Sequence, residues 1–260
     1  MTIHYITIHH ATTKWIDIQL RHIQHFTRDY KVWALFSKDL RLSEHEHKYH
    51  FLGHKKSKSG HESDDHEMGL TQLTNTVCTD PNVSEDDILI FLDSDALPIG
   101  DINNYIQCNL EEYEFGAVNR IENLGCLAPH PSFAFCKVKF WKDNQFHWGR
   151  DKSFDSNVDW RGDVGGILFK HLNDKGISWL KIQRNSKKSL FIDPLLYCTY
   201  GDIVYHHCAG SRGVFKTRAT PSYMLDEKNK EFFSKIYSEA GNYIWETINS
   251  DYFIELYGSD

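Results

Sequence analysis

Five consecutive apolar residues, Ile88 to Leu92, lead directly into Asp93, Ser94 and Asp95, and no other segment constrains the fold as strongly. An uninterrupted apolar run of this length is typical of a strand that is buried on both faces, as in a parallel sheet covered by helices. In open α/β sheets, ligands bind beyond the carboxyl ends of the strands. The sequence therefore predicts that the two carboxylates lie at a ligand site on the edge of such a sheet.

The N-terminal region has the pattern of a β-α-β unit. Short apolar strands are predicted over 4–9 and 32–36, and between them the apolar residues of 15–26 recur at the spacing of one helical face. Consecutive strands joined through a helix usually run parallel in one sheet. We therefore expect an α/β fold with a Rossmann-like, mostly parallel central sheet flanked by helices.

The remaining chain continues this alternation. Residues 38–62 are polar and rich in histidine, and they are expected to form a mobile surface loop. Ser59 and Glu62 have the spacing of a capping box, which predicts a helix whose inward stripe includes Ser63 and His66. Further predictions are strands over 115–121, 132–141, 179–183 and 202–207, a helix over 164–173, and a helical tail after Asp226.

Charge and hydropathy exclude several kinds of partner. The net charge of -7 and the pI near 6.1 argue against nucleic acid held through its phosphates, which would need a basic face. No stretch approaches the roughly 20 apolar residues of a membrane span, and the N-terminus lacks the basic head and apolar core of a signal peptide. We expect no membrane span and a cytoplasmic location.

The six cysteines are scattered without CxxC spacing in a chain large enough to fold without cross-links. They are expected to be reduced thiols, so that neither a disulfide nor a structural zinc site is predicted.

Asp93 and Asp95 are candidate ligands of a divalent cation. Two carboxylates one residue apart can share one ion, or one can bind the ion while the other binds a ribose or metal-bound water. A cation that bridges diphosphate oxygens neutralises the charge that develops when a nucleotide diphosphate leaves. His206 and His207 end a later apolar stretch and offer a third ligand, and imidazole together with carboxylates favours Mn²⁺ over Mg²⁺.

The order of these features resembles that of GT-A glycosyltransferases. A β-α-β start, an apolar strand that enters Asp-Ser-Asp, and a late H-x-x-G from His207 to Gly210 carry the resemblance, which spans most of the chain. It implies transfer of a sugar from a nucleotide-diphosphate donor, with UDP- or GDP-sugars favoured, to a hydroxyl acceptor such as a glycan. It also implies that Asp95 and His207 bind Mn²⁺ (or Mg²⁺), with Asp93 at the metal, its water or the ribose; His206 stays an alternative to His207.

The resemblance also divides the chain and suggests donor contacts. It implies a single domain in which residues 1–100 bind the nucleotide-sugar, 101–225 bind the acceptor and supply the metal histidine, and 226–260 form the helical tail. The predicted donor-binding residues lie at the first strand end, near the start of the helix after 62, in the Asp-Ser-Asp turn and after the histidines: Thr7, His9, Ser63, His66, Asp93, Ser94 and Arg212. Many family members have lysine where this chain has Arg212.

Asp163 precedes the predicted helix 164–173, where an aspartate is a good N-cap. Inverting GT-A enzymes resemble this arrangement and place an acidic general base at such a position. Asp163 is therefore predicted to accept the proton of the acceptor hydroxyl, with Asp159 as the alternative, and inversion is expected. Trp148 and other aromatic residues of the same region could stack on an acceptor sugar.

Two other functions fit parts of the pattern. A nucleotidyltransferase or phosphohydrolase also uses paired carboxylates with a divalent cation, but a sugar nucleotidyltransferase would normally have a glycine-rich basic loop after the first strand. A non-catalytic sugar- or protein-binding module is compatible with any such fold. The oligomeric state is not predicted.

Overall fold

The computed structural model describes residues 1–10, 12–37, 40–55, 62–119, 127–151, 164–185, 198–208, 239, 242–248 and 250. The strands are β1 (Ile3–His9), β2 (Tyr30–Phe36), β3 (Phe51–His54), β4 (Ile88–Leu92), β5 (Ala96–Pro98), β6 (Phe115–Asn119), β7 (Pro129–Lys137), β8 (Leu180–Asn185), β9 (Cys198–Tyr200) and β10 (Val204–His206). The helices are α1 (Ile16–Phe26), α2 (Glu62–Thr79), α3 (Ile102–Leu110), α4 (Val138–Asn144) and α5 (Gly166–Asp174), with a 3-10 turn, η1 (Glu46–Lys48).

The strands form one mixed sheet in the order β3-β2-β1-β4-β7-β6-β8-β9-β10-β5. Strands β3, β2, β1 and β4 run parallel, β7 is antiparallel to both β4 and β6, and β6 pairs parallel with β8. The last three strands pair antiparallel with their neighbours. The large central sheet of an α/β fold is thus confirmed, and its parallel part carries β4 next to β1.

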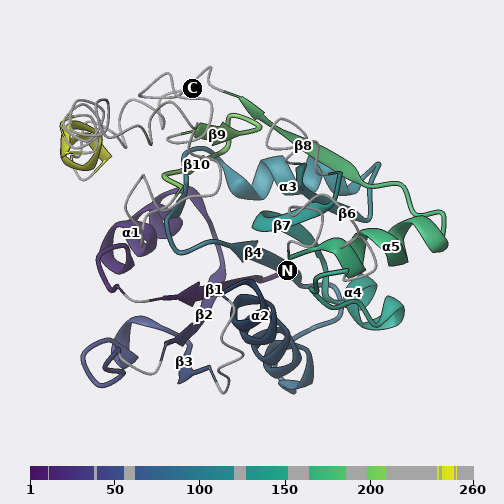
Figure 1. Cartoon of the computed structure of the whole chain (residues 1–260), viewed down its shortest axis with the longest axis horizontal. Helices are drawn as coiled ribbons and strands as arrows, with labels where there is room; N and C mark the ends of the chain where they lie inside the picture. The colour runs from purple at the N-terminus through teal and green to yellow at the C-terminus, as the bar shows by residue number, and fades with distance from the viewer. Residues whose placement is uncertain are drawn as a thin grey trace, which may run out of the picture.

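Helices cover both faces of this sheet (Figure 1). This explains why the sequence of β4 is apolar throughout. Leu89 and Phe91 point into a core that they share with α2, α4 and α5. Ile88, Ile90 and Leu92 point into the opposite core, to which α1 and α3 contribute. Because successive side chains of a strand face opposite sides, only a strand covered on both faces buries all five of these residues.

Most predicted elements are confirmed. The strands predicted over 4–9 and 32–36 and the helix over 15–26 correspond to β1, β2 and α1, and the helix predicted over 164–173 corresponds to α5. In the predicted tail, residues 242–248 are helical. Among the described helices, none is both long and apolar enough to cross a membrane.

Several predictions were wrong in detail. The strand predicted over 132–141 ends at Lys137, because the amides of Val138 and Lys139 donate hydrogen bonds to the carbonyls of Asp87 and Glu85, and the chain turns into α4. The loop predicted over 38–62 contains η1, which is mostly exposed, and β3, whose residues are mostly half-buried and lack a clear alternation. Strands β5 and β9 were missed because three residues show no periodicity, and α3 was missed as well.

Candidate functional site

The carboxylates of Asp93 and Asp95 lie in a tight turn between β4 and β5. The amide of Ala96 donates to the carbonyl of Asp93 over 2.9 Å, and the side chain of Gln19 donates to the carbonyls of Asp93 and Ala96 over 2.8 and 3.0 Å. Gln19 is completely buried, so α1 fixes the shape of this turn from beneath. The sequence did carry a signal for this role: Gln19 is a polar residue three positions after Ile16 on the apolar stripe of α1.

Strand pairing brings a histidine to these carboxylates. Strand β10 pairs antiparallel with β5, so that His206 lies opposite Ala96, and the amide of His207 donates to the carbonyl of Asp95 over 3.0 Å. Nε2 of His206 is 3.2 Å from Oδ1 of Asp95 and 3.7 Å from Oδ2 of Asp93. Asp93, Asp95 and His206 thus offer three potential ligand atoms within 4.8 Å of one another.

The neighbouring His207 is the first residue after β10, and its side chain packs on a different set of residues. Its ring packs against Trp15 with centroids 4.6 Å apart, and its Nδ1 is 3.1 Å from the hydroxyl of Tyr205. Burial lowers the pKa of His207 to about 4, so this side chain is a neutral core residue. Of the two histidines between which the sequence left the choice open, the geometry favours His206 over the predicted His207 as the partner of the carboxylates.

The electrostatics of His206 show an excess of negative charge. Burial alone lowers the pKa of His206, but the charges of Asp95 and Asp93 and the hydrogen bond with Asp95 outweigh burial and raise it. The two carboxylates thus favour a positive charge between them. Either a protonated His206 or a bound metal cation supplies this positive charge.

The donor set fits a divalent cation. With metal–oxygen bonds of about 2.0–2.5 Å, adjacent ligands of a six-coordinate cation lie roughly 2.9–3.5 Å apart. The 3.2 Å and 3.7 Å separations from Nε2 to the two carboxylates are close to this range. Two carboxylates with one imidazole suit Mn²⁺ better than Mg²⁺.

Of the remaining predicted residues near the carboxylates, the structure brings His66 to the site. Nε2 of His66, on α2, is 3.6 Å from Oδ1 of Asp93, and its side chain is 27 % exposed, which leaves it accessible to a ligand. Ser94 is half-buried within the turn itself. The side chain of Ser63 and all of Asp163 and Arg212 lie outside the described residues.

Thr7 and His9 lie at the end of β1 but face the protein interior. The hydroxyl of Thr7 donates to Oε1 of Gln19 over 3.5 Å, and Nε2 of His9 is 3.1 Å from the hydroxyl of Tyr49. Burial lowers the pKa of His9 to about 3. In this arrangement both side chains support the sheet edge, and their contact with a nucleotide stays a prediction.

The proposed acceptor platform is wrong for Trp148. This side chain is completely buried, and its ring lies 5.0 Å from Phe91 and 5.8 Å from Trp141. Trp148 is therefore part of the core under β4 and cannot stack on a sugar.

Comparison with known proteins gives distant structural likenesses. No protein-family model matches the chain, and a search of curated proteins finds no match either. Among solved structures, the glycosyltransferase GlyE of Streptococcus pneumoniae TIGR4 is 15% identical with a TM-score of 0.46, over 70% of this chain and 45% of that one. Its apo form gives 16% and 0.44 over the same shares, and S. aureus TarS gives 13% and 0.40 over 61% of this chain and 32% of that one. This chain therefore spans less than half the length of these structures.

Proposed function

We propose that the chain is a metal-dependent glycosyltransferase that moves a sugar from a nucleotide-diphosphate donor to a hydroxyl acceptor. The observation that carries the proposal is the convergence of Asp93, Asp95 and His206 just beyond β4. A closely spaced carboxylate pair with an imidazole suits a cation that in turn holds a diphosphate, and the site lies at the sheet edge where α/β folds bind nucleotides.

Each residue has a defined role in the proposed reaction. Asp93, Asp95 and His206 would hold the cation, which when bound supplies the positive charge that neutralises the departing diphosphate. His66 lies beside Asp93 and is positioned to donate a hydrogen bond to a donor oxygen from the start of α2, where free amides and the helix dipole also favour an anion. Gln19 keeps the carboxylates in place through the turn carbonyls.

The transfer itself needs a base. The bond between the anomeric carbon and the diphosphate oxygen breaks while the acceptor oxygen forms a new bond to that carbon, and the hydroxyl proton passes to a carboxylate. From the sequence we assign this role to Asp163, with Asp159 as the alternative, and propose inversion at the anomeric carbon. The nucleotide is proposed to be UDP or GDP, the metal Mn²⁺, and the acceptor a glycan.

The test is a panel of UDP-, GDP-, dTDP- and CMP-sugars, with and without Mn²⁺, read out by thermal stabilisation and donor hydrolysis. Asp95→Asn is the test variant. Asp86→Asn is the matched control, because Asp86 is a highly exposed aspartate before β4 that pairs only loosely with Lys137, at 3.6 Å. We expect one donor to stabilise the unmodified chain and Asp86→Asn, and to be slowly hydrolysed by both. The same donor should neither stabilise Asp95→Asn nor be hydrolysed by it.

The other outcomes separate the alternatives. Cleavage of the donor's diphosphate by water to a nucleoside monophosphate and a sugar 1-phosphate, instead of release of free sugar, would assign the site to a phosphohydrolase. Formation of a nucleoside triphosphate and a sugar 1-phosphate when pyrophosphate is added would assign it to a nucleotidyltransferase. Metal-independent sugar binding without turnover would indicate a binding module. Either result would refute the glycosyltransferase proposal.

A further inference from the structure

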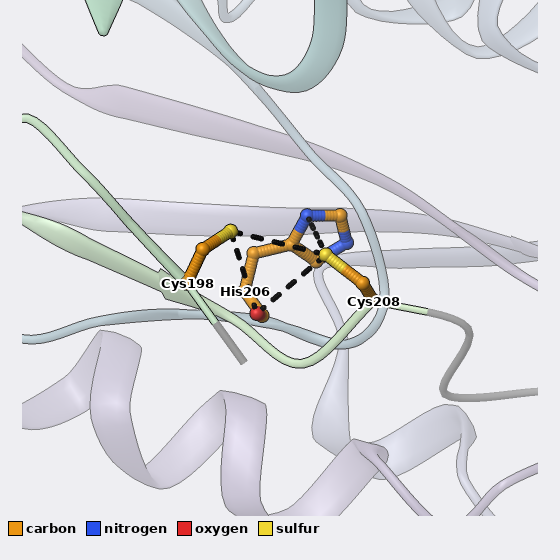
Figure 2. Close-up of side chains that lie close together, drawn as sticks. All are labelled: Cys198, His206 and Cys208. Carbon is orange, nitrogen blue, oxygen red and sulfur yellow. Dashed lines mark hydrogen bonds between the residues drawn. The ribbon is translucent and has the colours of Figure 1, made fainter. Parts of the chain in front are cut away.

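A second cluster of ligating side chains lies behind His206, on the side away from the carboxylates. Strand β9 pairs antiparallel with β10, which places Cys198 directly opposite His206. Cys208 has a left-handed backbone with φ 58°, and this bend turns the chain just after β10. Figure 2 shows the outcome, in which the thiols of Cys198 and Cys208 and the imidazole of His206 face one another.

The distances between these atoms suit one small ion. Sγ of Cys208 is 3.9 Å from Sγ of Cys198 and 3.3 Å from Nδ1 of His206, and ligand atoms of all three residues lie within 4.8 Å of one another. Zinc bonds of about 2.3 Å to sulfur and 2.0–2.1 Å to nitrogen put two sulfurs of a tetrahedral site roughly 3.8 Å apart, and sulfur and nitrogen roughly 3.6 Å apart. Binding would therefore need shifts of only a few tenths of an ångström along these two edges.

The chemistry of the donors also selects the ion. Two thiolates and one imidazole are soft ligands that prefer a thiophilic cation such as Zn²⁺ to Mg²⁺ or Mn²⁺. Both sulfurs are free thiols, and Cys198 and His206 are buried, so a bound ion would be shielded from water on two sides. The hydroxyl of Tyr200 lies 2.8 Å from Nδ1 and would give up this hydrogen bond when the ion binds.

We propose that Cys198, Cys208 and Nδ1 of His206 form a zinc site that shares its histidine with the carboxylate site. The two thiols release their protons as zinc binds, and the imidazole stays neutral with its one proton on Nε2. Nε2 then donates to Asp95, 3.2 Å away, and has no lone pair for a second cation. When zinc is bound to the cysteines, His206 can therefore not also bind the cation of the carboxylate site. Only this consequence rests on the proposed function.

The test measures metal binding rather than activity. Reduced, metal-free protein is titrated with Zn²⁺ in competition with a chromophoric chelator, and with Co²⁺ to detect the thiolate-to-cobalt charge-transfer band. We expect one zinc equivalent, a charge-transfer band, and an affinity lower by at least about 100-fold in Cys198→Ser and Cys208→Ser. Cys108→Ser is the control, because Cys108 is exposed on α3, and it should bind as the unmodified chain does.

Asp95→Asn separates this proposal from the proposed function. In the zinc-bound protein Asp95 is only the outer hydrogen-bond partner of His206, so Asp95→Asn should lower zinc affinity by no more than about 10–100-fold and keep the charge-transfer band, while its Mn²⁺ affinity is lost. Loss of zinc binding in Asp95→Asn, or unchanged zinc affinity in both serine variants, would overturn the proposal by placing the ion elsewhere. The charge-transfer band on the unmodified protein keeps the test decisive even if a serine variant fails to fold: without the band the proposal is refuted.

Discussion

Two buried histidine–aspartate pairs with the same separation lie at opposite ends of β4. Nε2 of His4 is 3.2 Å from Oδ2 of Asp87, and Nε2 of His206 is 3.2 Å from Oδ1 of Asp95. Asp87 immediately precedes β4 and Asp95 follows it. The separation alone therefore does not distinguish the two pairs, and their surroundings must.

The pair at the start of β4 is closed, in the sense that other groups of the protein satisfy its hydrogen bonds. Asp87 accepts hydrogen bonds from the amides of Thr2 and Ser84 over 2.7 and 2.9 Å, and Nδ1 of His4 accepts one from Trp33 over 3.1 Å. Burial lowers the pKa of His4 more than Asp87 raises it, so the imidazole is neutral and donates its one proton to Asp87. The protein itself satisfies these groups, which makes the pair a structural element.

The pair beyond β4 differs by one additional carboxylate. Oδ2 of Asp93 is 3.7 Å from the same Nε2 of His206, and its other oxygen is 3.6 Å from His66. One imidazole proton cannot serve two carboxylates, so negative charge is left over. The comparison teaches that a second carboxylate beside a buried pair, more than the pair itself, makes a cation site out of a structural contact.

The largest expected effect is on metal affinity. Asp95→Asn should lower Mn²⁺ affinity by at least about 100-fold, beyond the roughly 10–100-fold typical of losing an outer-sphere partner. Its unfolding free energy should change by less than about 1 kcal/mol, because removing one of two like charges offsets the weakened contact with His206. Calorimetric Mn²⁺ titration and urea unfolding measure the two quantities, and unchanged affinity would remove Asp95 from the site.

The reciprocal variant should show the reverse. Asp87→Ala leaves the amides of Thr2 and Ser84 and the buried His4 without their acceptor, and should lower the unfolding free energy by about 3 kcal/mol. Mn²⁺ affinity of the folded protein should stay within about threefold, since the two sites share no partner. A large affinity loss in well-folded Asp87→Ala would show that the two ends are coupled, contrary to the comparison.

An intermediate effect separates the two adjacent histidines. His206→Gln should lower Mn²⁺ affinity about 10–100-fold, whereas His207→Gln, whose ring packs on Trp15, should mainly lower stability. Both variants are measured by the same Mn²⁺ titration, with thermal unfolding to register the stability change. The opposite ranking would restore His207 as the ligand.

The sequence predicts the two aspartates of this site well and its histidine poorly. Strand β4 and its two aspartates follow from a local pattern, since an unbroken apolar run must be buried and its polar end must lie at the sheet edge. The choice of His206 depends on the pairing of β10 with β5, two strands of three residues, which brings His206 to Asp95 across 111 positions of the sequence. Such short strands carry no periodicity, so no local pattern predicts which of the two histidines faces the carboxylates.

The cysteine cluster was missed for a related reason. The absence of CxxC spacing led to a prediction of reduced thiols without a structural zinc site, but β9 and β10 pair, and the left-handed Cys208 turns the chain directly after β10. A non-glycine residue in this conformation is uncommon, and no sequence pattern announces it. Tertiary pairing, rather than spacing along the chain, thus creates both groups of ligands around His206.

The smallest expected effect is on pH dependence, where the two pairs should have opposite signs. Burial lowers the pKa of His4 in the folded chain, so the stability linked to His4 is present at neutral pH and lost as pH falls below about 6.5, where the unfolded chain gains a proton. Although burial lowers the pKa of His206 as well, Asp95 and Asp93 raise it overall. In the metal-free chain its contribution is therefore complete below about 6.5 and lost as pH rises through the raised pKa.

Urea unfolding of the metal-free chain and of Asp95→Asn across this pH range isolates the second contribution, because His4 is common to both and cancels in the difference. The stability of the unmodified chain relative to Asp95→Asn should fall as pH rises, while Mn²⁺ affinity rises over the same range because binding needs neutral His206. If the difference is independent of pH, Asp95 does not favour a charged His206. The pair beyond β4 would then be as closed as the pair before it, and a second carboxylate would not be enough to make a cation site.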